Sequence, residues 1–160
     1  MTFISGMKIR LRCFSLILSS LLLVACETDT VYHHFEHTRI VGWERNDTLT
    51  FAVPAVPSDG NYREELTLRV NNDYPFMGLT LIVEQTVFPG KRHFCDTLNC
   101  RVTDKEGNNR GRGIAFYEYD YPLKQLALHA GDSLQVRVRH YMKREIVPGI
   151  ADVGIRIRKK

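Results

Sequence analysis

An all-β fold, an antiparallel β-sandwich of about eight strands, is the fold class that this sequence predicts, and three observations predict it. Apolar and polar residues alternate over many short segments, as in half-buried strands. Residues typical of turns separate these segments. No segment has the spacing of an amphipathic helix, so the helical crossovers of an α/β fold are missing. Short, evenly spaced strands with hairpin turns favour an immunoglobulin-like or jelly-roll sandwich.

The expected strands are marked by apolar residues at every second position, which should face the core. In chain order these residues are Leu49, Phe51 and Val53; Leu66, Leu68 and Val70; Leu79, Leu81 and Val83; Leu98, Cys100 and Val102; Ile114 and Phe116; Leu126 and Leu128; Leu134, Val136 and Val138; and Val153, Ile155 and Ile157. The expected turns are 54–60, 71–75, 89–90, 104–109, 130–132 and 148–149.

The N-terminus has the features of an export signal. Lys8, Arg10 and Arg12 precede an apolar run over 14–24, which at roughly 11 residues is too short to span a bilayer. The sequence Leu-Val-Ala-Cys at 23–26 resembles the bacterial lipobox. We therefore expect a cleaved lipoprotein signal peptide at 1–25, acylation of Cys26 as a membrane anchor, a short tether over 26–32 and a single sandwich domain over 33–160.

The charge of the chain changes once the signal is removed. The formal net charge is +4, from 22 basic and 18 acidic residues. The signal contains three of the basic residues and none of the acidic ones, so 19 basic residues remain against 18 acidic residues. A nearly neutral mature chain gives no reason to expect nucleic acid as a partner.

Two cysteines remain in the expected domain, in a compartment that permits disulfides. Cys100 shares a strand face with Leu98 and Val102, and Cys95 has the opposite parity. In a continuous strand their Cα atoms would be roughly 16 Å apart, beyond the approximately 7 Å limit for a bridge. Two interpretations therefore stay open: a disulfide with a turn near Asp96, or a buried Cys100 and a half-exposed Cys95.

Several segments of the mature chain resemble the gliding-motility lipoprotein family GldH of the Bacteroidetes. These segments are 31–32, Trp43, 47–51, 68–72, 74–76, 96–98, 102–107, 111–114 and, as the most specific, 141–157. The chain departs from the family pattern at Asn109, where a tryptophan is expected. It also has Lys143 inserted between Met142 and Arg144, which form a methionine-arginine pair in the family. The resemblance implies a role in the envelope machinery for gliding and protein secretion, other envelope proteins as partners, and an anchor in the outer membrane.

Two rows of side chains are candidate interaction surfaces. We expect Arg137, Arg139, Arg156 and Arg158 to face outward, and a hairpin across Pro148-Gly149 would set them side by side as a basic face. The alternative is a solvated sheet face. Tyr117, Tyr119 and Tyr121 share the parity opposite to Ile114 and Phe116, and they either stack on sugars or a partner or form a second core face.

Other clusters favour ordinary structural roles. The histidines and glutamate of 33–37 match no familiar metal spacing, and 104–109 lacks the distal glutamate of a calcium loop and fits a hairpin turn. No nucleophile elbow, zinc-protease helix or phosphate loop is present, and His93 beside Cys95 lacks an identifiable orienting group. We therefore expect no catalytic residues, no metal and no cofactor. The main prediction is a non-catalytic envelope lipoprotein, and the alternative is a surface lipoprotein that binds glycan.

Overall fold

The computed structural model describes residues 29–160. The expected signal peptide and the acylated Cys26 lie outside the described residues. In the part described, the chain forms ten strands and no helix, and hence no helix that is long and apolar enough to cross a membrane. The strands are β1 (Thr30–His37), β2 (Trp43–Glu44), β3 (Leu49–Val53), β4 (Gly60–Asn71), β5 (Gly78–Phe88), β6 (Arg92–Arg101), β7 (Phe116–Leu128), β8 (Ser133–His140), β9 (Ile146–Val147) and β10 (Ile150–Lys159).

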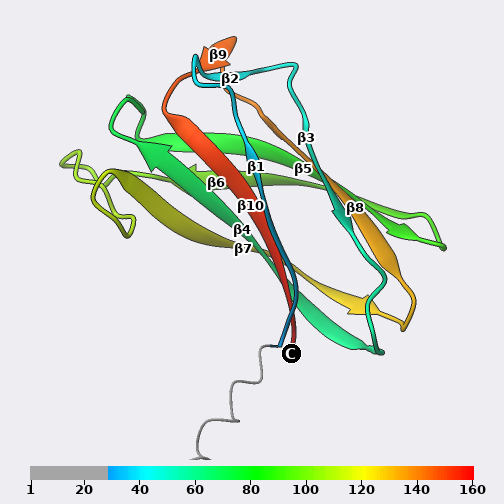
Figure 1. Cartoon of the computed structure of the whole chain (residues 1–160). Coiled ribbons are helices and arrows are strands. Elements are labelled where there is room, and N and C mark those ends of the chain that lie inside the picture. Colours follow the sequence, from blue (N-terminus) through cyan, green and yellow to red (C-terminus); the bar gives the residue numbers. More distant parts are fainter. Residues whose placement is uncertain (1–28) are drawn as a thin grey trace, which may run out of the picture.

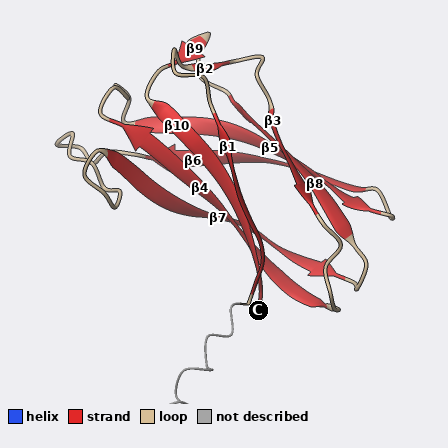
Figure 2. Ribbon diagram, in the orientation of Figure 1, coloured by secondary structure: helices blue, strands red, loops and turns tan. Residues whose placement is uncertain are grey.

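The strands form two four-stranded antiparallel sheets packed as a sandwich, which confirms the predicted fold class (Figures 1 and 2). The first sheet has the order β1-β10-β4-β7, and the second has the order β3-β8-β5-β6. We call them sheet A and sheet C. The two-residue strands β2 and β9 pair with each other above one end of the sandwich.

The core lies between the two sheets and is formed by the alternating apolar residues that mark the strands in the sequence. In β3 the burial alternates strictly, with Leu49, Phe51 and Val53 buried and the residues between them exposed. The predicted inward residues of β4, β5, β8 and β10 are likewise all buried. In β6 the pattern is weaker, since Leu98 is only half-buried while Cys100 is buried.

The prediction for Ile114 and Phe116 is wrong, because neither side chain faces the core. Ile114 lies in the loop before β7 and is 90% exposed, and Phe116, the first residue of β7, is also exposed. The reason is a β-bulge in β7. Arg63 pairs with Gln125 but Glu65 pairs with Pro122, so β7 has one extra residue there. A bulge reverses the parity of a strand, so even-numbered residues face inward after it and odd-numbered ones before it.

The first strand begins earlier than expected. β1 starts at Thr30 and pairs with β10, whereas we expect the domain to begin at residue 33. The expected tether is correspondingly shorter. β1 lacks a clear apolar alternation because histidines occupy half of its centre, which is why the sequence pattern alone leaves it between tether and strand.

The antiparallel strands divide the loops between two ends of the sandwich. At the near end lie Asp29, Lys160 and the loops 54–59, 89–91 and 129–132. The first described residue meets the C-terminal strand there, since the Lys159 amide donates to the Asp29 carbonyl at 2.7 Å. At the far end lie the loops 38–48, 72–77, 102–115 and 141–149, together with β2 and β9.

Candidate functional site

The exposed large apolar side chains of the described part all lie at the far end. They are Ile40, Val41, Met77, Ile114, Phe116, Tyr141 and Ile146. They come from all four far-end loops and from the strand ends beside them. None comes from the near end. Exposed apolar residues scattered singly need no explanation, but a gathering at one end of a molecule is typical of an interaction surface.

Trp43 and His140 support the far end from beneath. Both are fully buried, and their rings meet edge to face with centroids 5.5 Å apart. His140 Nε2 lies 3.1 Å from the Trp43 carbonyl oxygen, so it carries the proton and donates, and Nδ1 accepts from the Met142 amide at 3.4 Å. Burial lowers the pKa of His140 and so favours this neutral form. The pair therefore fixes the chain around Met142.

The four arginines that we predicted to form one basic face are divided between two sheets. Arg137 and Arg139 lie on β8 in sheet C, and Arg156 and Arg158 lie on β10 in sheet A. The predicted hairpin is wrong because Pro148-Gly149 joins β9 to β10, and β9 pairs with β2 rather than bringing β8 beside β10. The outward orientation holds for both pairs, since their neighbours Val136, Val138, Ile155 and Ile157 are buried.

The arginines of sheet A are neutralised by acidic neighbours on the same face. Glu65 lies 2.7 Å from Arg158 and 3.7 Å from Arg156. Asp120 accepts a hydrogen bond from the buried Thr67 and lies 2.6 Å from Arg112. The charged side chains on this face of sheet A form a network of ion pairs, which fits a structural role for them.

The arginines of sheet C have fewer acidic neighbours. Arg137 lies 3.4 Å from Glu84, and no ion pair of Arg139 occurs within the described residues. Arg101 of β6 is exposed on the same face, because its neighbour Cys100 points into the core. Sequence reasoning missed Arg101, although the parity of Cys100 already predicts its outward direction.

The tyrosine row packs inward, so it belongs to the core rather than to a surface open to sugars. Tyr119 is 6% exposed, and Tyr117 and Tyr121 pack partly buried against the core. The rings of Tyr119 and Tyr121 stack with centroids 6.3 Å apart, and the Tyr121 hydroxyl donates to the Arg101 carbonyl at 2.7 Å. Of the two interpretations of this row, the structure bears out the second core face.

The histidines of β1 alternate between the two faces of sheet A. His34 packs against Phe51 with ring centroids 6.4 Å apart, while His37 contacts Asp152 of β10. Between them in the sequence, Phe35 makes a cation–π contact with Arg69, whose Cζ atom lies 3.9 Å from the centroid of the Phe35 ring. Among residues 29–160, no group of three or more His, Cys, Asp or Glu side chains is placed to hold a metal ion.

Residues 104–109 form a tight turn, as the sequence predicts. One carboxylate oxygen of Asp104 accepts from the amides of Glu106 and Asn108 at 3.0 and 2.8 Å. These hydrogen bonds, above all the one from Asn108, lower the pKa of Asp104. Gly107 adopts a φ of +86°, which favours glycine.

The two cysteines of the domain are free thiols on one continuous strand. Cys95 and Cys100 both lie in β6, which pairs with β5 without interruption. Cys95 is exposed and Cys100 is buried, so they point to opposite faces. This arrangement agrees with the second of the two interpretations given above.

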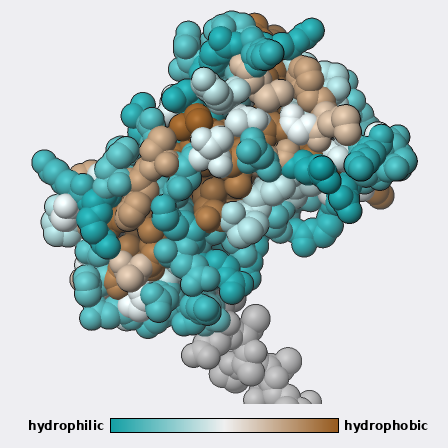
Figure 3. All heavy atoms as spheres, turned by 180° about the vertical axis from the view of Figure 1, so that it is seen from behind, coloured by the Kyte–Doolittle hydropathy of each residue, from teal (hydrophilic) through white to brown (hydrophobic). Residues whose placement is uncertain are grey.

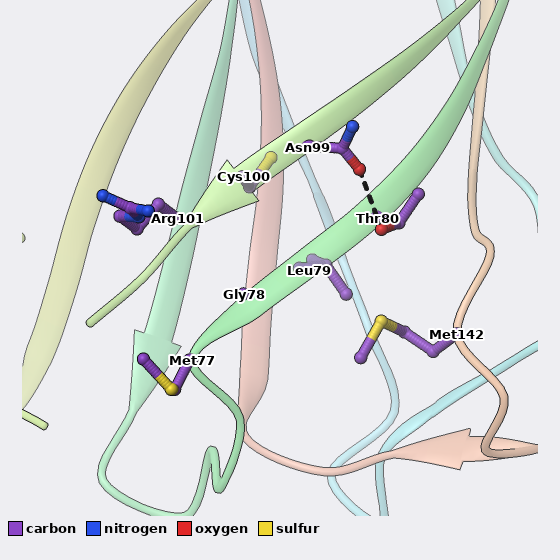
Figure 4. A pocket seen from close by; sticks show the side chains of 8 residues that line it. All are labelled: Met77, Gly78, Leu79, Thr80, Asn99, Cys100, Arg101 and Met142. Carbon is purple, nitrogen blue, oxygen red and sulfur yellow. Dashed lines mark hydrogen bonds between the residues drawn. The ribbon is translucent and has the colours of Figure 1, made fainter. Parts of the chain in front are cut away.

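Hollows border the apolar side chains of the far end. One, of about 450 Å³, lies on the sheet A side and includes Ile40, Phe116 and Ile150 in its lining. Another hollow, of about 520 Å³, lies at the far end of sheet C (Figure 4). On the face seen from behind, apolar residues form a band between hydrophilic margins (Figure 3).

Fold and surface together define a small antiparallel β-sandwich protein whose exposed apolar side chains gather at one end. A family model described as GldH lipoprotein matches residues 30–157. Gliding motility lipoprotein GldH of Flavobacterium johnsoniae is 30% identical over 156 residues, which cover 91% of this chain and 94% of that protein. A GldH homolog of Christiangramia forsetii is 26% identical, with the same coverage of both chains. The chain therefore belongs to the GldH lipoprotein family, and it is a lipid-anchored protein of the cell envelope.

Two solved structures are similar to this chain at low TM-score and low sequence identity. A family 35 carbohydrate binding module from Clostridium thermocellum has a TM-score of 0.39 and 14% identity, over 71% of this chain and 75% of that one. A family GH115 glucuronidase, BtGH115A, has a TM-score of 0.41 and 13% identity, over 82% of this chain and 18% of that one.

Proposed function

We propose that this lipoprotein is a non-catalytic interaction module that contributes to the assembly or stability of a gliding-motility and protein-secretion complex. The observation that supports this role best is the concentration of exposed apolar side chains at the far end. Such side chains contribute binding free energy when a partner removes them from water. The buried pair Trp43 and His140 holds two of the segments that carry these side chains, those around Trp43 and Met142.

The position of the anchor agrees with this proposal. Cys26 lies three residues before Asp29, so an acyl group on Cys26 attaches at most about 11 Å from the near end. The ten residues of β10 span about 33 Å between the two ends. A lipid anchor therefore holds the near end close to the membrane while leaving the far end free for envelope proteins. We further propose the outer membrane as the site of the anchor, which the family resemblance supports.

Affinity purification from detergent-solubilised envelopes tests the proposed role. The tagged full-length chain should recover envelope proteins of the motility and secretion machinery, and the double variant Ile40→Asn/Ile114→Asn should lose most of them. Both side chains are almost fully exposed, so these changes leave the core intact. Deletion of the gene should in addition impair secretion or motility.

A matched pair of substitutions at the near end is the control. Ala55→Asn/Ala130→Asn introduces the same polar group at two exposed positions and should leave recovery unchanged. Recovery of no envelope partner by the wild-type chain would refute the proposal, as would equal loss in both double variants. A Cys26→Ala variant should be lost from the membrane fraction. This loss tests the lipid anchor separately from the far-end surface.

A further inference from the structure

A groove crosses sheet C at the far end of the sandwich. Its first part is the hollow of about 520 Å³ in Figure 4, where Met77 and Met142 approach the start of β5 from two different loops. Its second part, of about 410 Å³, is lined by Arg45, Tyr141, Met142 and Lys143. Met142 lines both parts, so the two hollows adjoin at this residue.

The groove is a built feature of the fold rather than a gap between mobile loops. The Met142 amide donates to buried His140, and its carbonyl accepts from Arg45 Nη2 at 2.9 Å. The Tyr141 amide donates to the Thr80 carbonyl at 2.8 Å and ties the same segment to β5. Thr80 in turn donates to Asn99 of β6 at 3.0 Å, and both side chains line the hollow (Figure 4).

The lining combines an apolar floor with positive charge. The accessible apolar side chains of the lining are those of Met77 and Met142, and thioethers adapt to partner side chains of varied shape. Arg101 lines the first part of the groove, and Arg45 and Lys143 line the second. No carboxylate lines either part.

Two of these three cations are free of acidic partners. Arg45 lies 3.7 Å from Glu145. Within the described residues, no carboxylate oxygen lies within 4 Å of the charged groups of Arg101 or Lys143, and both residues are exposed. A charged group without a partner at the edge of an apolar hollow favours a ligand that supplies the opposite charge.

We propose that this groove binds an extended segment of a partner protein in which apolar side chains alternate with aspartate or glutamate. The apolar side chains occupy the methionine-lined floor, and the carboxylates pair with Arg101 and Lys143. A protein segment fits better than lipid phosphate, because the groove lies at the end of the sandwich opposite the terminus that leads to Cys26. This inference rests on the proposed function and specifies the chemistry of its partner.

Binding of defined peptides to the detergent-solubilised full-length chain tests the proposal. One fluorescent twelve-residue peptide alternates Glu with Phe and Leu, and a second has Lys in place of every Glu. We expect the acidic peptide to bind saturably and about tenfold or more tightly than the basic one. Raising the salt concentration should weaken this binding, because the charges are exposed.

Charge reversal locates the site. Arg101→Glu/Lys143→Glu should lower affinity for the acidic peptide about tenfold or more, whereas Lys105→Glu/Lys160→Glu changes the net charge equally, outside the groove, and should have little effect. Equal binding of both peptides, no saturable binding, or an unaffected groove variant would overturn the proposal. So would binding to vesicles of acidic phospholipid that the groove variant alone abolishes.

The purification experiment distinguishes failure of this inference from failure of the proposed function. If Ile40→Asn/Ile114→Asn abolishes recovery of envelope proteins but the acidic peptide does not bind the groove, docking at the far end stands and the acidic partner segment is rejected. If neither result is obtained, both proposals fail.

Discussion

Glu64 of β4 has its carboxyl group in the core, where it is 1% exposed. Gln85 of β5 donates a hydrogen bond to one of its oxygens, and the other oxygen has no partner. Burial raises the pKa of Glu64 to about 7, and the charge of Asp96 on β6 adds to this while Lys124 on β7 opposes it. Ionising this buried carboxyl group therefore costs folding free energy, so the stability of the fold depends on its protonation state.

The free energy of unfolding should fall as the pH rises from 4.5 to about 7. The folded state holds the Glu64 proton to higher pH than the unfolded chain, whose pKa is near 4.5, so the unfolded state binds fewer protons in this window. The loss is on the order of 3 kcal/mol at most. Chemical denaturation of wild type and Glu64→Gln across this range measures it, because glutamine cannot titrate.

The exposed Glu106→Gln variant is the control and should retain the wild-type pH dependence. A Glu64→Gln profile parallel to the wild-type profile would show that folding does not raise the pKa of this carboxyl group. Protonation of buried His140 acts in the opposite direction, since its lowered pKa costs stability as the pH falls below about 6.5. The difference between the two profiles isolates Glu64.

The two thiols of β6 should differ strongly in reactivity. Cys100 is 2% exposed and burial raises its pKa to about 12, whereas Cys95 is exposed. A thiol reagent applied to folded domain 29–160 should therefore modify Cys95 alone, and both thiols only after denaturation. No reaction in either state until a reductant is added would instead indicate a disulfide.

At the scale of the elements, parity predicted much of the sandwich and failed where long-range pairing decides. The inward residues of β3, β4, β5, β8 and β10 follow from alternation, because each strand buries one face. Alternation cannot reveal which strands become neighbours, so Arg137 and Arg156 were assigned to one face although β8 and β10 lie in different sheets.

The bulge in β7 limited the prediction of the candidate site in the same way. The tyrosines before the bulge and Leu126 and Leu128 after it face the same core with opposite parity. The local sign of the bulge is Pro122, but proline within a sheet fits an edge strand as well as a bulge, and β7 is an edge strand. If the bulge is ignored, Ile114 and Phe116 have the parity of Leu126, so alternation predicts core positions for both and hides the far-end apolar surface.

The turn that joins β9 to β10 should tolerate substitution poorly. Gly149 has a φ of +81°, and a Cβ atom there would lie 2.3 Å from the Tyr74 backbone nitrogen. Gly131 has a φ of +91° but no neighbour within 4 Å. Gly131→Ala should cost about 1 kcal/mol, for backbone strain alone, and Gly149→Ala about 3 kcal/mol or more, because backbone must also move.

Denaturant unfolding of both alanine variants checks this difference. Because the two glycines have similar φ angles, the strain is matched and the contrast reports the contact with the 72–77 loop. Equal destabilisation of the two variants would mean that the far-end loops do not pack as described. A much larger loss for Gly149→Ala would show that this packing contributes to the stability of the sandwich.

At the scale of the whole molecule, the two ends of the sandwich differ in kind. The near end contains the first described residue, the C-terminus and turns without an exposed large apolar side chain, and Lys159 Nζ donates there to the Ser58 hydroxyl at 2.8 Å. The far end presents seven exposed apolar side chains around hollows on both sheets. We propose that this division gives a lipid-anchored protein one end for the membrane and another for its partners.

Photo-cross-linking in intact cells tests this division most directly. A photoreactive amino acid replaces Ile114 at the far end or Ala130 at the near end of the full-length lipidated chain; both positions are exposed. We expect cross-links to envelope proteins from position 114 and few or none from position 130. Protein cross-links from position 130 that equal those from 114, or lipid as the sole product at 114, would contradict the account.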